Sequence, residues 1–138
     1  MAEGGHKFHI DRRAYLDSDE RKSYLDALAI LRTFGIRKGM RVADVGAGTG
    51  FFAVPASELV GPRGHVDAVD LAPEMPEDLQ TKRVRLRLRN VTPARSTEDR
   101  IPLPDAAVDF VLLACVLHEL DGPGTLLETR RILRSDGT

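Results

Sequence analysis

A glycine-spaced turn between two apolar runs limits what this chain can fold into more than any other feature of its sequence. Residues 42–50 read Val-Ala-Asp-Val-Gly-Ala-Gly-Thr-Gly, and a second short apolar run, 66–69, ends at Asp70. Because glycine has no Cβ, such a turn lets bare backbone approach a ligand closely. An acid at the tip of the next strand is placed to accept hydrogen bonds from the two hydroxyls of a ribose. The pairing predicts that a nucleoside-bearing cofactor binds across the tips of two parallel strands.

The spacing of the glycines indicates whether the turn is of the dinucleotide-binding type. A dinucleotide-binding turn follows G-x-G-x-x-G, and its third glycine lets helix and strand pack tightly. Here Gly46, Gly48 and Gly50 follow G-x-G-x-G, and Phe51 stands where the third dinucleotide glycine would be. A nicotinamide-dependent oxidoreductase is therefore an alternative that the turn disfavours.

Six segments follow one another in a recognisable order: 7–21, 40–52, 65–75, 101–113, 117–119 and 131–137. Together they resemble the motifs of the class I S-adenosylmethionine-dependent methyltransferases, most closely the UbiE-like (methyltransferase type 11) group. The resemblance covers nearly the whole chain. It implies S-adenosyl-L-methionine as cofactor, a Rossmann-like fold, and methyl transfer to a small organic acceptor.

The resemblance also implies roles for individual residues. The methionine end of the cofactor would lie on the turn formed by Gly46, Ala47, Gly48 and Gly50, and Asp44 would help to anchor its amino group. Asp70 would accept both ribose hydroxyls, and Leu71 would lie against the adenine. The alternatives are structural: the glycines could only form a tight turn, Asp70 could cap the segment that starts at Pro73, and Leu71 could belong to the core.

The acid that would accept a hydrogen bond from the adenine amino group is harder to identify in this sequence. The family commonly places it some four residues before the Ile-Pro-Leu-Pro stretch, and that position falls on Thr97, with Glu98 next to it. A threonine accepts a hydrogen bond without charge assistance. Either Glu98 substitutes for the missing acid, or the adenine is bound more weakly.

His118 and Glu119 follow the expected fourth strand and would face the mouth of the site. His118 is the candidate catalytic residue, because a histidine can act as a general base near neutral pH. It could instead only shape the pocket, since alignment of the nucleophile with the reactive methyl does much of the catalysis. Cys115, the only cysteine, is expected to be a small buried hydrophobe.

Hydrophobic periodicity predicts three helices, at 18–34, 51–60 and 125–134. In the first, Gly35 would end the helix and the inward residues would be Tyr24, Leu28, Leu31 and Phe34. In the last, the inward residues would be Leu126, Leu127, Ile132 and Leu133. Pro55 would kink the second helix mildly if that helix begins near Thr49.

Strands are expected at 41–45, 66–69, 84–88 and 108–114. The third alternates Val84, Leu86 and Leu88 with arginines, as a half-buried outer strand would. The predicted fold is α/β, a Rossmann-like, mainly parallel sheet with flanking helices and strand order 3-2-1-4.

A complete family member would continue beyond Thr138 into a fifth strand and an antiparallel pair. We therefore expect a leader at 1–17 and an incomplete methyltransferase domain at 18–138 that lacks the C-terminal strands. The fourth strand would then present an uncovered apolar edge, a hazard for self-association. A non-catalytic methyltransferase-like module that binds a partner chain is the second alternative function.

Bulk composition excludes several other classes. With 138 residues the chain forms one domain, and its formal net charge of −1 creates no global field toward nucleic acid or membrane. The arginines within 83–89 alternate with apolar residues, and no aromatic side chain lies among them to stack on bases. This pattern favours a solvated sheet face over a nucleic-acid site. No apolar run approaches the ~20 residues of a membrane span, no secretory signal is evident, and no cluster has metal-ligand spacing. A cytoplasmic enzyme is the simplest interpretation.

Overall fold

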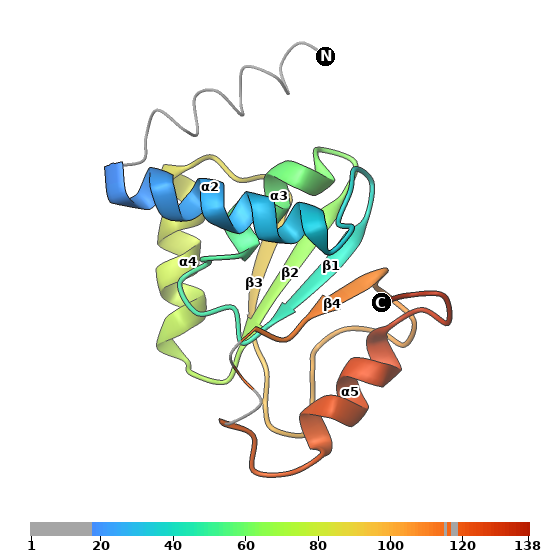
Figure 1. Cartoon of the computed structure of the whole chain (residues 1–138). Coiled ribbons are helices and arrows are strands. Elements are labelled where there is room, and N and C mark those ends of the chain that lie inside the picture. The colour runs from blue at the N-terminus through green and yellow to red at the C-terminus, as the bar shows by residue number, and fades with distance from the viewer. Residues whose placement is uncertain (1–17, 115, 117–118) are drawn as a thin grey trace.

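The computed structural model describes residues 18–114, 116 and 119–138, so the expected leader lies outside the described residues. Figure 1 shows helices packed on a central sheet. The helices are α2 (Ser18–Thr33), α3 (Ala53–Val60), α4 (Glu74–Arg85) and α5 (Gly124–Ile132), and the strands are β1 (Arg41–Val45), β2 (His65–Asp70), β3 (Val91–Arg95) and β4 (Phe110–Leu112).

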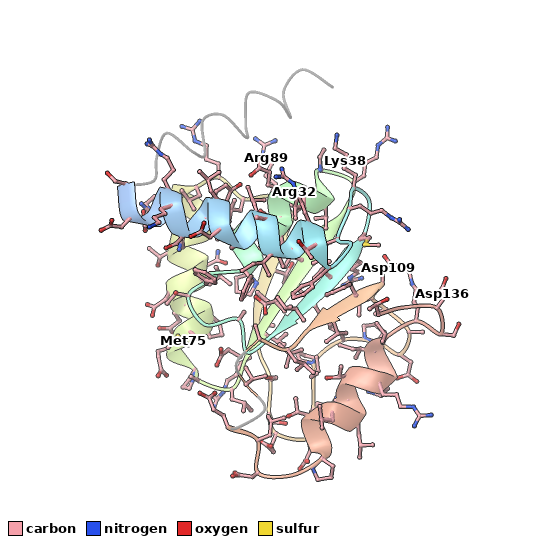
Figure 2. All side chains as sticks on the ribbon, in the orientation of Figure 1. Arg32, Lys38, Met75, Arg89, Asp109 and Asp136 are labelled. Atoms are coloured by element: carbon pink, nitrogen blue, oxygen red, sulfur yellow. The ribbon has the colours of Figure 1, made fainter. Side chains whose placement is uncertain are left out.

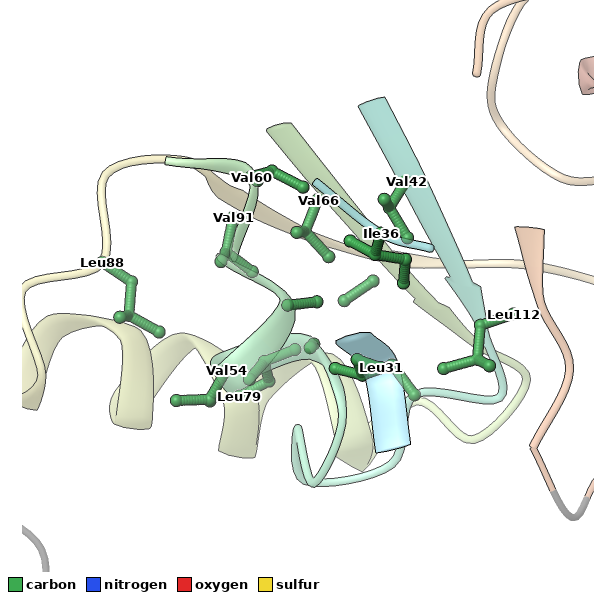
Figure 3. Packing of buried hydrophobic residues seen from close by; sticks show 14 of the residues in the cluster. Leu31, Ile36, Val42, Val54, Val60, Val66, Leu79, Leu88, Val91 and Leu112 are labelled. Carbon is green, nitrogen blue, oxygen red and sulfur yellow. The ribbon is translucent and has the colours of Figure 1, made fainter. Parts of the chain in front are cut away.

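The sheet is parallel throughout, in the order β3-β2-β1-β4. This confirms the predicted fold class and strand order. Alternate residues of β1 point to opposite faces, as strand geometry requires: Val42 belongs to the core beneath α2, α3 and α4, whereas Ala43 belongs to a second cluster with Ile132 of α5. Figure 3 shows the first of these cores, in which Leu31, Val54 and Leu79 converge on the sheet.

Helix α2 packs much as its periodicity predicts. Tyr24, Leu28 and Leu31 are buried. Gly35 caps the helix as predicted: the amides of Gly35 and Ile36 donate to the carbonyls of Arg32 and Leu31, the paired bonds of a Schellman cap. The inward placement of Phe34 was wrong, since this side chain is 51% exposed. It follows the last helical residue and has left the buried face.

Helix α3 begins at Ala53, later than predicted. Pro55 therefore falls in the first turn, where a backbone N–H would have no intrahelical partner. The condition for the expected kink, a helix that begins near Thr49, is therefore not met, and the proline removes no hydrogen bond that the helix needs.

The predicted strand at 84–88 was wrong. Helix α4 continues to Arg85, and the chain then turns through Arg87, whose φ is 55°. Leu79 and Leu86 lie seven residues apart, two turns of a helix, and both are buried. The alternation was thus the end of an amphipathic helix followed by a turn. The third strand is β3, which contains Pro93 and lies at the edge of the sheet, where a proline is tolerated.

The last two elements are shorter than predicted. Strand β4 covers Phe110–Leu112, and Val108 forms only an isolated bridge with Leu133. In α5, Leu126 and Leu127 are 45% and 61% exposed, so their inward placement was wrong, and Thr125 and Ile132 are the buried residues.

The outer edge of β4 is partly paired rather than uncovered. The amide of Val111 donates to the carbonyl of Thr138 (2.9 Å), and the amide of Thr138 donates to the carbonyl of Asp109 (3.0 Å). The segment after α5 therefore runs beside β4. Among the described residues, the structure contains no helix long and apolar enough to cross a membrane.

Candidate functional site

The glycine turn follows β1 and is fastened to the end of β2. The amides of Gly46 and Ala47 both donate to the carbonyl of Val69, at 2.8 and 3.0 Å, and the amide of Gly48 donates to Oδ2 of Asp70 at 2.8 Å. Gly46 and Gly50 have φ values of 80° and 95°, which side-chain-bearing residues rarely adopt. The turn and the acid, which the sequence pattern predicted to be neighbours, are in direct contact.

Asp70 stands at the tip of β2 and also shapes the loop that follows. Its Oδ1 accepts a hydrogen bond from the amide of Ala72 at 3.0 Å, in addition to the bond from Gly48 to Oδ2. The residue that precedes α4 is Pro73, and no side chain caps that helix. Two carboxylate oxygens offer about four acceptor sites, so Asp70 retains capacity for a ligand's hydroxyls.

Asp44 lies beneath the turn, and one oxygen of its buried carboxyl has no hydrogen-bond partner in the described part of the chain. That oxygen is Oδ2, and the side chain is 2% exposed. Burial raises the pKa of the Asp44 carboxyl to about 7, and the Asp70 carboxylate adds to the shift. Buried polar atoms are normally satisfied, so this oxygen is suited to a cationic group that a ligand would supply.

A small cavity of about 70 Å³ lies at the carboxyl ends of the strands. Its lining includes Asp70, Leu71 and Gly46, together with four residues that the sequence interpretation missed, Ser96, Val116, Leu120 and Thr125. Ligand pockets usually exceed roughly 300 Å³, so a nucleoside cofactor must displace side chains that now fill the cleft. Val116 is one of them, because a Cβ on Gly46 would collide with it.

Thr97 and Glu98 lie beside this cavity rather than among the residues that line it. The amide of Thr97 donates to the carbonyl of Arg100, and Oε1 of Glu98 accepts a hydrogen bond from the amide of Asp121 at 3.0 Å. Their roles toward adenine remain predictions. Ser96, immediately before them, is 5% exposed and is the first residue after β3, so a correct placement of that strand would have indicated it.

Glu119 lines the mouth of the cavity, as its place after β4 predicted. His118 and Cys115 lie outside the described residues, so the proposed base is not placed. In the part of the chain that the structure describes, no group of three or more His, Cys, Asp or Glu side chains could hold a metal ion.

A second hollow, of about 290 Å³, lies on the α2 side of the turn. It is lined by residues of α2, the turn, α3 and α4, among them Tyr24, Thr49, Phe51 and Lys82. Burial lowers the pKa of Lys82, and the negative charge of Glu20 partly offsets that effect. This hollow shares no lining residue with the cavity above Asp70.

Replacement of Gly50 by alanine tests how tightly the turn is packed. A Cβ there would collide with Leu79 and crowd Val54, and the backbone conformation is unfavourable for alanine. We expect the free energy of unfolding to fall by about 2–4 kcal/mol, measured by urea denaturation. Gly122→Ala is the matched control, because a Cβ at Gly122 meets nothing within 4 Å. Equal stability of the two variants would contradict this packing.

Comparison with known proteins gives consistent results. The family described as "Methyltransferase domain" matches residues 42–137. The UbiE C-methyltransferase of ubiquinone and menaquinone biosynthesis from Pasteurella multocida is 33% identical over 108 residues, which are 75% of this chain and 39% of that protein. A protein-L-isoaspartate O-methyltransferase from Methanothrix thermoacetophila is 46% identical over 57 residues, 41% of this chain and 27% of that protein.

Among solved structures, a SAM-dependent methyltransferase from Aquifex aeolicus superposes with a TM-score of 0.78 and 38% identity, covering 90% of this chain and 66% of that one. The chain spans only part of the curated relatives that it matches, between 27% and 47% of the length of the first of them.

Proposed function

The chain belongs to the class I S-adenosylmethionine-dependent methyltransferases, in their UbiE-like group, and from this premise we propose that it transfers a methyl group from S-adenosylmethionine to a small organic acceptor. The observation that carries the proposal is a carboxylate oxygen of Asp44 that no described residue hydrogen-bonds, buried beneath a glycine turn that Asp70 holds in place. The cofactor is cationic, and this arrangement offers it two carboxylates.

The residues present fit the parts of this cofactor. Asp44 would bind the ammonium of its methionine end, directly or through water, and the bare backbone of Gly46 would let that chain pass closely. Asp70 would accept the ribose hydroxyls with its remaining lone pairs. Leu71, which is 39% exposed beside the cavity, offers an apolar surface to adenine, and Ser96 offers a hydroxyl at the same place.

S-adenosylmethionine supplies an electrophilic methyl group on a sulfonium sulfur, which takes the electron pair of the broken carbon–sulfur bond as the acceptor's nucleophile bonds to the methyl carbon. The protein's part is to hold the two reactants in line and to exclude water. The acceptor must lose a proton when its nucleophile is an O–H, N–H or C–H group. His118 is our candidate for accepting that proton.

Partners and location follow from the same proposal. We propose a small-molecule acceptor, no nucleic-acid substrate, and a place in the cytoplasm, where the single cysteine would remain a thiol. Self-association through β4 also stays a proposal, now limited to the part of its edge beyond the pairing with Thr138.

The test is methyl transfer by the full-length protein. We expect S-adenosylhomocysteine to form from S-adenosylmethionine when a panel of phenols, quinols, amines and carboxylates is supplied, and to form only in background amounts without an acceptor. Tight binding of S-adenosylhomocysteine with no transfer to any acceptor would favour the non-catalytic module. Failure to bind either form of the cofactor would contradict the proposal altogether.

A further inference from the structure

Positive charge is concentrated at the end of the sheet opposite the cofactor cavity. Three connections precede the amino ends of the parallel strands: 34–40 before β1, 61–64 before β2 and 86–90 before β3. They and the end of α2 carry six exposed basic side chains, here termed the basic edge: Arg32, Arg37, Lys38, Arg63, Arg87 and Arg89. In Figure 2, Arg32, Lys38 and Arg89 lie in the upper part of the molecule, and Met75, near the start of α4, lies well below them.

Few acidic side chains lie beside the basic edge: Asp109 and Asp136 line the same hollow as Arg37 and Lys38, and Asp109 already pairs with Arg134. The three connections contain no Asp or Glu. Within the described part of the chain, none of the six side chains forms an ion pair, whereas basic residues elsewhere do: Arg41 with Asp67, Arg85 with Glu20, Arg131 with Glu128, and Arg134 with Asp109. The net charge of −1 therefore conceals a region in which exposed basic side chains outnumber acidic ones, because the fold separates charges that the composition averages.

Helix dipoles explain only part of this concentration. Helices α2, α3 and α4 all end here, and basic residues stabilise the carboxyl ends of helices. Arg32 in the last turn of α2 has that role, as do Lys82, Arg83 and Arg85 in α4. The effect decays within one helical turn. The other five members of the basic edge lie in connections rather than helices, so they exceed what the dipoles require.

Large apolar side chains are exposed in the same region. Phe34, 51% exposed, lies between Arg32 and Arg37 in the sequence and borders a hollow together with Arg37 and Lys38. Val84, 66% exposed, lies in the last turn of α4, next to Arg85. Basic side chains interspersed with an aromatic and an aliphatic residue fit the boundary of a bilayer, where cations meet lipid phosphates and apolar side chains enter the headgroup region.

We propose that the basic edge docks the protein on a membrane surface that contains anionic lipid, without any segment crossing the bilayer. The patch has the size of known lipid-binding clusters, about four to eight basic residues. Duplex nucleic acid fits less well, since its phosphates would leave Phe34 and Val84 without an apolar environment. Because the cofactor cavity lies at the other end of the strands, docking in this manner leaves its mouth facing the water. This proposal is independent of the methyltransferase chemistry.

The experiment is co-sedimentation of the full chain with vesicles of phosphatidylcholine alone and of an equimolar mixture of phosphatidylcholine and phosphatidylglycerol. We expect binding to the mixed vesicles only, weakening as salt is raised because screening shortens the reach of the charges. The triple variant Arg37→Gln, Lys38→Gln, Arg89→Gln should bind at least tenfold more weakly. The matched control, Lys22→Gln, Arg95→Gln, Arg130→Gln, removes the same residue types from exposed positions elsewhere and should bind like the wild type.

Phe34→Ser separates lipid from other polyanions. It should weaken vesicle binding severalfold and leave any binding to duplex DNA unchanged. The proposal is overturned by absence of binding to the mixed vesicles, by equal binding of the triple variant and its control, by an unchanged vesicle affinity of Phe34→Ser, or by tighter binding to duplex DNA than to the vesicles at the same salt. Circular dichroism of each variant confirms that the fold is retained.

Discussion

Replacement of Asp44 by asparagine is expected to stabilise the cofactor-free protein above pH 7 and to weaken its binding of S-adenosylhomocysteine at least tenfold. The two effects have one cause. In the free protein the Asp44 carboxylate is buried and its Oδ2 accepts no hydrogen bond from the residues that the structure describes, so its ionisation costs free energy. In the complex that charge meets the ligand's ammonium, and hydrogen bonds to charged groups contribute about 1.5–3 kcal/mol.

The pH dependence follows from the raised pKa. In the folded protein the pKa of Asp44 is raised from its ordinary value of 3.8 to about 7, so the carboxyl keeps its proton up to about pH 7. The stability that this protonation provides is complete below about pH 4 and is lost progressively until the pH passes the folded pKa near 7. One pKa unit corresponds to about 1.4 kcal/mol, so the loss approaches about 4 kcal/mol as an upper bound. Asparagine does not ionise, so the Asp44→Asn variant does not lose this stability as the pH rises.

The measurement is the free energy of unfolding of wild type and Asp44→Asn at pH 5 and pH 8, with calorimetric affinities for S-adenosylhomocysteine at pH 8. Asp67→Asn is the contrasting control, because that buried carboxylate has Arg41 as a partner at 2.8 Å and should lose stability at pH 8. A wild-type affinity that rises between pH 6 and pH 8 would agree with the account. Equal destabilisation of Asp44→Asn at both pH values would contradict it.

Replacement of Asp70 by alanine is expected to reduce the affinity for S-adenosylhomocysteine by at least an order of magnitude, and more if both ribose hydroxyls are bound. The substitution removes two charged acceptors. It also releases the amides of Gly48 and Ala72, which the carboxylate holds at 2.8 and 3.0 Å, so the glycine turn loses its attachment to the end of β2.

Asp70→Asn separates these contributions. An asparagine oxygen can still accept one of the backbone hydrogen bonds, so this variant should keep the stability of the wild type better than Asp70→Ala while still binding the ligand weakly. Glu74→Ala, at an exposed carboxylate in the first turn of α4, controls for a general loss of negative charge and should bind like the wild type. Isothermal titration calorimetry measures all four affinities. An unchanged affinity of Asp70→Ala would refute the role given to this residue.

The features that could be predicted from sequence were those that a short segment encodes by itself. The glycine turn and Asp70 each end an apolar run, and the carboxyl ends of neighbouring parallel strands necessarily meet at one edge of the sheet. The pattern therefore predicted that the glycine turn and Asp70 lie close together, although not that Asp70 bonds to the amide of Gly48. Strand order followed from the family resemblance, and the structure confirms it.

The errors arose where tertiary packing decides. Leu86 and Leu88 alternate with arginines as in a strand, yet the burial of Leu86 below Leu79 belongs to a helix end, and no local pattern distinguishes the two. The third strand contains Pro93, and a proline is unfavourable in a strand unless that strand lies at an edge, which only the fold shows. Ser96 was missed as a consequence. The basic edge was missed because its members lie in separate connections that only the fold brings to one end.

The central claim is that an adenosyl ligand lies over the turn of Gly46–Gly50 between the tips of β1 and β2. The most direct measurement is a crystal structure of the protein with S-adenosylhomocysteine. The account predicts that the ribose lies against the Asp70 carboxylate, that the ligand's ammonium faces Asp44, and that Val116 has moved off Gly46. Density for the ligand in the hollow beside Tyr24 and Lys82, with Asp70 still bonded only to Gly48 and Ala72, would contradict it.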